Sequence, residues 1–440
     1  MGGGRTARED PVNPRAPLVV ALDMGYGHLR AAAALADAAG TSVVEADRPP
    51  LADAEEQAAW RRARSFYEAL SRATDLPVVG PAFRGVLDSI TRIPRLSATG
   101  DMTRPTAAVR MLRRMADKGL GRGLVGHLRT SGRPLLTTFY APAIVAADAG
   151  LDGVTCVVTD VDVNRVWVPR DGAGSRITYC VPAERTAQRL LRYGVAEERI
   201  RRTGFPLPGV LVGGEDLVAA KSNLASRLAR LDPSGAFRRA AADEIGAHLG
   251  DVAGDVSAAR RGDGPPLIAI LVGGAGAQVA VALEILAALG GGIVRGRWRV
   301  ALVAGTRAAV ADAFRVEVDR LGLSERLGSG VEILYAPTFE GYLAEFHALL
   351  ARTDVVWTKP SEMTFYAALG IPLLLARPLG VHERANRRWV KASGAAFDAK
   401  SGHRVLTHLE RGLADGALAA AAWNGFLRLP KHGTLRILGI

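Results

Sequence analysis

Hydrophobic and polar positions divide the chain into short apolar runs and longer segments with helical spacing. The apolar run Leu18–Leu22 is followed by a glycine turn, an alanine-rich segment over Leu29–Ala39, and a second run at Thr41–Glu45. This order predicts a strand–turn–helix–strand unit of a parallel sheet. Further elements are expected to be strands at Leu135–Thr138, Thr155–Thr159, Arg176–Val181 and Ile200–Arg202, with a helix at Ala183–Tyr193.

A second series of strands begins after a segment of helical pattern. Residues 210–264 carry apolar side chains at every fourth position and end in a charged, glycine-rich hinge, Arg260–Pro266. The later strands are expected at Leu267–Val272, Trp298–Val303, Val331–Tyr335, Val355–Trp357 and Leu373–Ala376. Because a proline-rich exit, Gly204–Gly209, separates the two series, the sequence predicts an α/β protein with two Rossmann-like domains facing across a cleft.

The domain boundaries follow from these shifts in pattern. We expect a disordered lead-in at 1–16, an N-terminal domain at 17–208, a helical linker or insertion at 209–264, a C-terminal domain at 265–404, and final helices at 405–440 that cross the cleft. At 440 residues and 46.4 kDa, two domains are the expectation from length alone.

Composition narrows the class of protein. With 48% hydrophobic and 23% charged residues the chain is typical of a globular protein. Both cysteines, Cys156 and Cys180, stand in apolar runs and are expected to be small buried hydrophobes, which fits a reducing compartment. The first residues lack the apolar core of a signal peptide, and no apolar run is long enough to span a bilayer, so we expect a cytoplasmic protein.

The net charge of +12 comes mainly from arginine. Such a field attracts an anionic membrane surface, nucleotide phosphates or nucleic acid, and it could equally reflect arginines on solvated helices. No basic stripe interleaved with aromatic residues is present, so a nucleic-acid partner is not expected.

Two glycine turns follow strands. In Gly25-Tyr26-Gly27-His28 the imidazole could accept a proton near neutral pH, or could simply cap the helix that follows. The second turn could present backbone N–H groups to a diphosphate, or could only pack helix on strand. This second turn consists of Gly273, Gly274, Ala275, Gly276, Ala277 and Gln278. Neither turn has the full spacing of a dinucleotide-binding or Walker loop.

Polar residues after later strands add three candidate features. Thr358–Thr364 and Leu379–Asn386 each follow an apolar strand and open a helix, so both helix N-termini are expected at one sheet edge, where an anion is favoured. Asp160 and Asp162 have the spacing of a metal-binding pair, but a turn aspartate is the expected reading, and no metal site is predicted.

Taken in order, these segments resemble the GT-B glycosyltransferases of the monogalactosyldiacylglycerol synthase group, glycosyltransferase family 28, which includes the lipid II-forming N-acetylglucosaminyl transferase. The resemblance covers about 18–34, 135–208 and 267–398 and is carried by the turns above, by Val181–Pro208 with its Thr203-Gly204-Phe205-Pro206 end, and by Thr159-Asp160 with Trp167. Asn164 departs from the family pattern, which commonly has histidine at this place.

The resemblance implies roles for individual residues. His28 would be the catalytic base, and Gly25, Tyr26, Gly27, Asp160 and Trp167 would line the acceptor side. The donor-binding residues would be those of the second glycine turn together with Thr358, Lys359, Pro360, Ser361, Glu362, Met363, Thr364, His382, Glu383, Asn386, Thr338, Phe339 and Arg307. Glu362 is a displaced candidate for the ribose hydroxyls, because the helix Phe365–Gly370 lacks the family's acid.

The activity implied is metal-independent, inverting transfer of a hexose from a nucleotide-diphospho-sugar, most simply a UDP-sugar, to an acceptor hydroxyl. The nucleotide-sugar is a co-substrate, and no cofactor is expected. The resemblance also suggests a lipid or glycan acceptor and a peripheral membrane location. Two alternatives stay open: a UDP-sugar epimerase or hydrolase on the same fold, and a non-catalytic nucleotide-sugar-binding protein.

Overall fold

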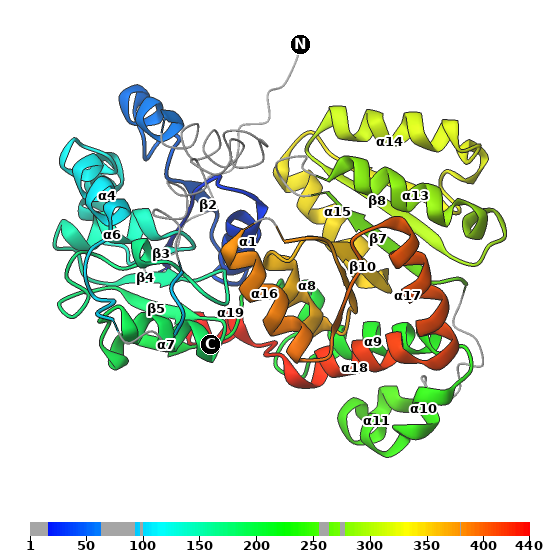
Figure 1. The fold of residues 1–440 in the computed structure, drawn as a ribbon. Helices are drawn as coiled ribbons and strands as arrows, with labels where there is room; N and C mark the ends of the chain where they lie inside the picture. Colours follow the sequence, from blue (N-terminus) through cyan, green and yellow to red (C-terminus); the bar gives the residue numbers. More distant parts are fainter. Residues whose placement is uncertain (1–15, 63–92, 97–99, 255–263, 273–277, 379) are drawn as a thin grey trace, which may run out of the picture.

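The computed structural model describes residues 16–62, 93–96, 100–254, 264–272, 278–378 and 380–440. Figure 1 shows two lobes, each a parallel sheet surrounded by helices. The N-lobe is built on the sheet of strands β1 to β6, and the C-lobe on the sheet of β7 to β12. The expected α/β fold with two Rossmann-like domains is therefore confirmed.

The N-lobe sheet has the order β2-β1-β3-β4-β5-β6. Its strands are β1 Leu18–Ala21, β2 Val43–Glu45, β3 Leu135–Thr137, β4 Val154–Val157, β5 Thr178–Val181 and β6 Ile200–Arg202. Leu18 and Val20 face one apolar cluster, whereas Val19 and Ala21 face another. Successive side chains of a strand point to opposite faces, so a fully apolar strand indicates a sheet that is covered on both sides.

Helices cover this sheet. They are α1 Tyr26–Ala38, α4 Ala107–Asp117, α5 Arg122–Ser131, α6 Tyr140–Asp148, α7 Glu184–Arg192, and the 3₁₀ turns η1 Arg165–Trp167 and η2 Glu197–Arg199. The buried face of α1 consists largely of alanine, which lets this helix lie close to β1. The start of α1 is thereby fixed at the carboxyl end of the sheet.

The C-lobe sheet has the order β12-β11-β10-β7-β8-β9. Its strands are β7 Leu267–Leu271, β8 Arg299–Gly305, β9 Val331–Tyr335, β10 Val355–Thr358, β11 Leu373–Leu375 and β12 Ala396–Asp398. In chain order this is the doubly wound Rossmann arrangement, and its strand order reverses between β7 and β10. Ligands of such sheets bind beyond the carboxyl ends of the strands at that reversal.

The C-lobe helices include several from the segment that the sequence set apart as a linker. They are α8 Gly209–Val212, α9 Val218–Leu231, α10 Ala236–Ala240, α11 Ala242–Leu249, η3 Gly250–Val252, α13 Val279–Val294, α14 Ala308–Arg320, η4 Ser324–Arg326, α15 Phe339–Arg352, η5 Glu362–Leu369, α16 Val381–Ala392, α17 Gly402–Asp415 and α18 Ala417–Arg428. Arg227 on α9 donates to the carbonyls of Thr353 and Leu369, so α9 is part of the C-lobe.

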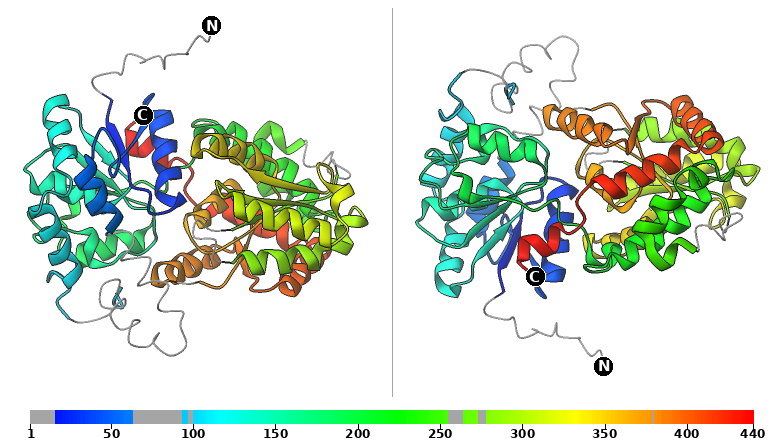
Figure 2. Two further views of the ribbon diagram at one scale, coloured as in Figure 1. Left: turned by 90° about the horizontal axis from the view of Figure 1, so that it is seen from above. Right: turned by 90° about the horizontal axis from the view of Figure 1, so that it is seen from below.

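The chain returns to the N-lobe at its end. After α18, α19 (Gly433–Leu438) packs against α1, and Ile437 joins the apolar cluster beneath β1. Thr434 Oγ1 donates to the carbonyl of Leu207 at 2.6 Å. Figure 2 shows this last red helix lying beside the blue N-lobe elements, apart from α17 and α18. The lobes are thus joined by two crossings of the chain. Of the helices described, none combines the length and the hydropathy that a bilayer span requires.

Candidate active site between the lobes

The two sheets bring the turns singled out in the sequence to their carboxyl edges. In the C-lobe, β7 and β10 are neighbouring parallel strands in which Ile270 pairs with Trp357. The loops that leave these strands therefore start from the same edge. Residues 273–277 (Gly273, Gly274, Ala275, Gly276 and Ala277) and Leu379 lie outside the described residues.

His28 occupies the corresponding edge of the N-lobe. Its Nδ1 lies 2.8 Å from the carbonyl oxygen of Thr138, just beyond β3, and 3.2 Å from Thr159 Oγ1, just beyond β4. A carbonyl only accepts, so Nδ1 carries the proton and Nε2 is left with its lone pair. Edge-on contact with Phe139, at 4.9 Å between ring centroids, also fixes the ring plane. The imidazole is thus held in the tautomer that a general base needs.

Charged groups of both lobes surround this imidazole. Burial lowers the pKa of His28, and His382 of the C-lobe lowers it further, whereas Asp160 and Glu362 oppose the shift. The net effect is a pKa below 6.5, so the ring is neutral at pH 7. Because Glu362 and His382 act on His28 electrostatically, the starts of η5 and α16 lie near the histidine across the lobe boundary.

Lys359 is a cation placed next to a buried acid. Its Nζ lies 3.2 Å from Glu383 Oε1, and Glu383 is only 4% exposed. Burial by itself would lower the pKa of Lys359, but the carboxylates of Glu383 and Glu362 outweigh burial and raise it. Lys359 therefore stays protonated, with its side chain 30% exposed, and it can meet an anion at this edge.

Glu362 is paired with an arginine of the other lobe. Arg30 Nη1, on α1, donates to Glu362 Oε1 at 2.6 Å, and Nη2 donates to the hydroxyl of Tyr342 on α15. The Arg30 guanidinium also lies over the rings of Tyr26, Tyr342 and Phe346, with its central carbon 4.2 Å from the Phe346 centroid. Arg30 is 4% exposed, so a charge from the N-lobe is buried within the C-lobe.

Tyr26 makes a second contact of α1 with the C-lobe. Its hydroxyl lies 2.9 Å from Thr306 Oγ1 and accepts from the Thr306 backbone N–H at 3.0 Å. Gly305 leaves room for the tyrosine, because a Cβ at this position would lie 2.7 Å from the tyrosine oxygen. Gly25 begins α1 at φ 121°, a conformation that glycine adopts without strain.

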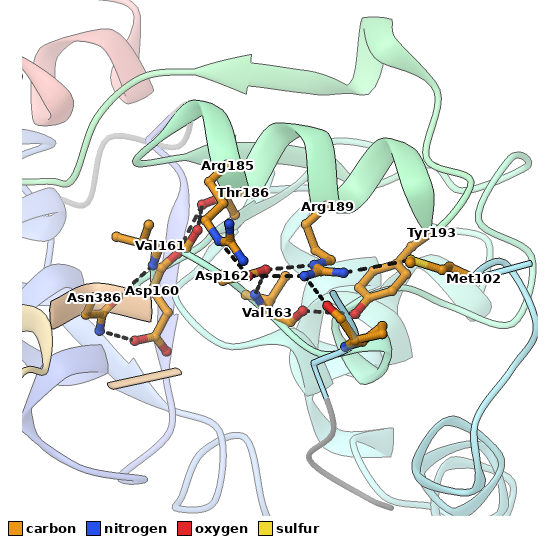
Figure 3. A network of polar contacts seen from close by, with 11 residues as sticks. Met102, Asp160, Val161, Asp162, Val163, Arg185, Thr186, Arg189, Tyr193 and Asn386 are labelled. Carbon is orange, nitrogen blue, oxygen red and sulfur yellow. Dashed lines mark hydrogen bonds and ion pairs between the residues drawn. The ribbon is translucent and has the colours of Figure 1, made fainter. Parts of the chain in front are cut away.

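Asn386 joins α16 to the loop after β4 (Figure 3). Its Oδ1 accepts from the Val161 backbone N–H at 2.9 Å, and its Nδ2 donates to Asp160 Oδ1 at 2.9 Å. The side chain is fully buried. The amide that the resemblance assigns to a sugar hydroxyl is thus bonded to the N-lobe in this structure.

The side chain of Asp162 has other partners than that of Asp160, as Figure 3 shows. Its Oδ1 accepts from Arg189 Nε at 2.7 Å, and its Oδ2 accepts from Arg185 Nε at 2.7 Å. Asp162 and Arg189 are buried within the N-lobe. Both carboxylate oxygens are therefore occupied by guanidinium groups, and the aspartate stabilises the lobe. Within the described part of the chain no cluster of three or more metal-ligating side chains occurs.

The remaining candidates differ in their access to this region. Four of the residues at the end of β10 and in the segment after it are buried, namely Thr358, Pro360, Met363 and Thr364, whereas Ser361 is partly exposed. Thr338 caps α15 by accepting from the Gly341 N–H, and the Phe339 ring lies 5.8 Å from that of Tyr26. Arg307 precedes α14 and is partly exposed; Gln278 precedes α13 at φ 96°. Trp167 is buried 6.4 Å from His28, measured between ring centroids.

One expected element differs in form. The segment after Ser361 is a 3₁₀ helix, η5, and not an α-helix. Its last turn is pressed against α18, where a Cβ at Gly425 would lie 2.3 Å from the Ala367 carbonyl oxygen, and Gly370 ends it at φ 72°. Because η5 is a 3₁₀ helix, only one of the two helix N-termini expected at this sheet edge, that of α16, has the strong macrodipole of an α-helix.

Sequence reasoning did not identify Arg30, Thr138, Tyr342 or Thr306 as part of the site. Arg30 carried a usable signal, since it is a charged residue on the otherwise alanine-rich buried face of α1, four positions after Tyr26. The others act through contacts between segments far apart in the chain, which no local pattern shows.

Comparison with solved structures agrees with this architecture. S. aureus MnaA in a structure with UDP is similar at a TM-score of 0.50 and 10% sequence identity, over 95% of this chain and 94% of that one. A. baumannii MurG gives 0.47 at 12% identity, over 96% and 98% of the two chains. A putative UDP-N-acetylglucosamine 2-epimerase of Listeria monocytogenes gives 0.48 at 11%, over 96% and 95%. No protein-family model and no curated protein sequence matches the chain. The likeness to MnaA, at this identity, defines the fold alone, which is GT-B.

Proposed function

We propose that the protein is a glycosyltransferase that moves a hexose from a nucleotide-diphospho-sugar, most simply a UDP-sugar, to an acceptor hydroxyl. The observation that carries this proposal is His28. Its Nδ1 proton is held by the Thr138 carbonyl, its pKa is lowered by burial, and it faces the polar loops of the C-lobe. A neutral imidazole with Nε2 as acceptor can take the proton of an attacking hydroxyl.

The chemistry balances without a further reactant. The acceptor oxygen gives its proton to His28 Nε2 and forms a bond to the anomeric carbon of the sugar. The bond from that carbon to the diphosphate oxygen breaks, and the nucleoside diphosphate leaves with the electron pair. Attack opposite to the leaving group inverts the anomeric centre. The proton on His28 then passes to solvent.

Charge on the leaving diphosphate would be met by groups of the C-lobe. Lys359 stays protonated beside Glu383, and the N-terminus of α16 adds the favourable end of a helix dipole. We therefore propose that no metal is needed. The resemblance in sequence to lipid-modifying transferases and the net charge of +12 favour a lipid-linked acceptor at an anionic membrane surface.

The donor half of this proposal can be tested before the acceptor is known. A thermal-shift screen would compare UDP, other nucleoside diphosphates and UDP-sugars, and a stabilising shift with UDP and UDP-sugars is expected. Replacing Lys359 by methionine should remove that shift. Replacement of Lys221, which lies on α9 outside the site, by methionine is the matched control. Absence of a shift with every nucleotide would contradict the proposal.

An epimerase is the second candidate, because Glu362 lies near enough to His28 to act on it electrostatically and could supply a second proton-transfer group. Mass spectrometry and NMR of the products separate the two activities. A transferase releases UDP only when an acceptor is added, whereas an epimerase converts the UDP-sugar without an acceptor.

A further inference from the structure

We infer that the start of α1 is a latch that closes the donor-binding side of the C-lobe, so that a nucleotide must release it in order to bind. We define the α1 latch as Tyr26, Gly27 and Arg30 together with their C-lobe partners Thr306, Tyr342 and Glu362. This inference rests on the proposed function, because Glu362, which the latch covers, is a candidate for binding the ribose of the donor.

Both oxygens of Glu362 are covered by α1. Oε1 accepts from Arg30 Nη1 at 2.6 Å. Oε2 faces the backbone of Gly27, where even a Cβ would approach it to 3.1 Å. The side chain is 11% exposed. Ribose hydroxyls cannot reach this carboxylate while α1 is in place, so donor contact with Glu362 requires the lobes to move apart.

The latch contacts cover more than this carboxylate. Tyr26 occupies the Thr306 N–H and hydroxyl, at the carboxyl end of β8. On the other side of the boundary, Asn386 is bonded to Asp160 and to the Val161 N–H. Three C-lobe groups next to the proposed donor site are thus bound to N-lobe groups, each at ordinary hydrogen-bond distance.

The polar contacts of the latch are incomplete. Arg30 Nε is buried and has no hydrogen-bond partner within the described residues, and the same holds for the hydroxyl of Tyr366, a neighbour of the latch that acts electrostatically on Arg30. A buried polar network that is only partly satisfied costs free energy, whereas solvation of these groups after opening recovers it. A ligand that binds the open form more tightly than the closed form can therefore shift the protein toward the open form.

The latch is also coupled to the proposed base. His28 lies between Gly27 and Arg30 in the first turns of α1 and is bonded to Thr138 of the N-lobe, so opening of the latch moves the imidazole relative to the C-lobe. Donor binding and placement of the base are then linked events. A nucleotide-sugar that takes Glu362 from Arg30 would set the position of His28 before the acceptor reacts.

The test compares wild type with Arg30→Met, which keeps an unbranched apolar chain in the aromatic surroundings but removes the guanidinium group and its charge. Arg387→Met is the matched control, because Arg387 pairs with Asp398 inside the C-lobe. Small-angle scattering should show a larger radius of gyration for Arg30→Met only. Calorimetric titration with UDP should show about fivefold tighter binding, since less of the protein is closed.

Opposite outcomes overturn the latch. An unchanged radius of gyration would show that Arg30 does not hold the lobes, and weaker UDP binding would show that Arg30 serves the donor. Glu362→Gln separates the two proposals: it should also enlarge the radius of gyration, yet weaken UDP binding. Failure of UDP to bind any of these proteins would contradict the proposed function, while the scattering result would still decide the lobe contact. Tyr342→Phe replaces Arg30→Met if the latter does not fold.

Discussion

At the scale of single residues, the arrangement of His28 follows from two neighbours that the chain supplies far from α1. Thr138 and Thr159 stand just beyond β3 and β4, and both place an oxygen near Nδ1. Because β1, β3 and β4 are adjacent parallel strands, these positions meet at one sheet edge. The tautomer of the imidazole is therefore fixed by the topology of the N-lobe.

The rate of transfer should depend on pH through His28. Burial lowers the pKa of His28 below 6.5, and only the neutral ring accepts a proton. We expect kcat/KM to be constant at pH values well above the lowered pKa and to fall by about tenfold per pH unit below it. The measurement is a pH–rate profile with a UDP-sugar. An acidic limb whose midpoint lies above 6.5 would contradict the assignment.

Substitution of Gly305 tests whether the two lobes approach each other closely at this residue. Its φ of 68° and a Cβ 2.7 Å from the Tyr26 hydroxyl both penalise a side chain. Gly305→Ala should lower the free energy of unfolding by about 1–3 kcal/mol, measured by urea denaturation. Gly126, exposed on α5 with no atom within 4 Å of its Cβ position, is the control. Gly126→Ala should instead stabilise by about 0.5–1 kcal/mol, and equal effects would contradict the contact.

At the scale of elements, the loop after β4 separates two aspartates by function. Asp160 points to the C-lobe and bonds Asn386, whereas Asp162 points into the N-lobe and ties the loop to α7 through Arg185 and Arg189. The buried pair anchors the loop, which keeps Asp160 beside the active site. Of the two carboxylates in this sequence motif, Asp160 therefore lies at the candidate site and Asp162 has a structural role.

The two arginines of α7 should contribute unequally. Arg189 is fully buried with Asp162, whereas Arg185 is 38% exposed. Arg189→Met leaves a buried carboxylate with Arg185 as its one charged partner and should cost about 3–5 kcal/mol of unfolding free energy. Arg185→Met, the matched control, should cost less than about 1 kcal/mol. Chemical denaturation measures both, and a larger loss for Arg185→Met would contradict the network.

Much of the element plan could be predicted because buried parallel strands are continuous apolar runs. The predicted runs at Leu267–Val272 and Leu373–Ala376 match the fully buried strands β7 and β11 to within one residue. β12 was missed, since Ala396–Asp398 is short and ends in a charged residue that pairs with Arg387. The 3₁₀ form of η5 could not be predicted either, because it arises from packing against α18.

At the scale of the site, the sequence identified the turns but not their partners. His28, Glu362 and Asn386 were singled out from local motifs, and the structure brings all three to the lobe boundary. Their contacts with Thr138, Arg30 and Val161 join positions more than a hundred residues apart in the first case and more than two hundred in the other two. Such pairs depend on how the lobes meet, which no local pattern encodes.

At the scale of the whole molecule, the two lobes share one chain that crosses between them twice, and α19 fastens the end of the chain to α1. The same helix carries the proposed base and the latch, so movement between the lobes and catalysis involve the same element. This arrangement explains why the polar side chains of the C-lobe loops are bonded across the boundary and not only among themselves.

The most direct measurement is the initial rate of UDP release from a UDP-sugar by wild type and by His28→Ala, with lipid-linked and soluble acceptors. We predict acceptor-dependent release by wild type, and loss of that release in the variant while UDP still binds. Equal rates in the two proteins would contradict the role of His28, and release that is independent of acceptor would contradict glycosyl transfer.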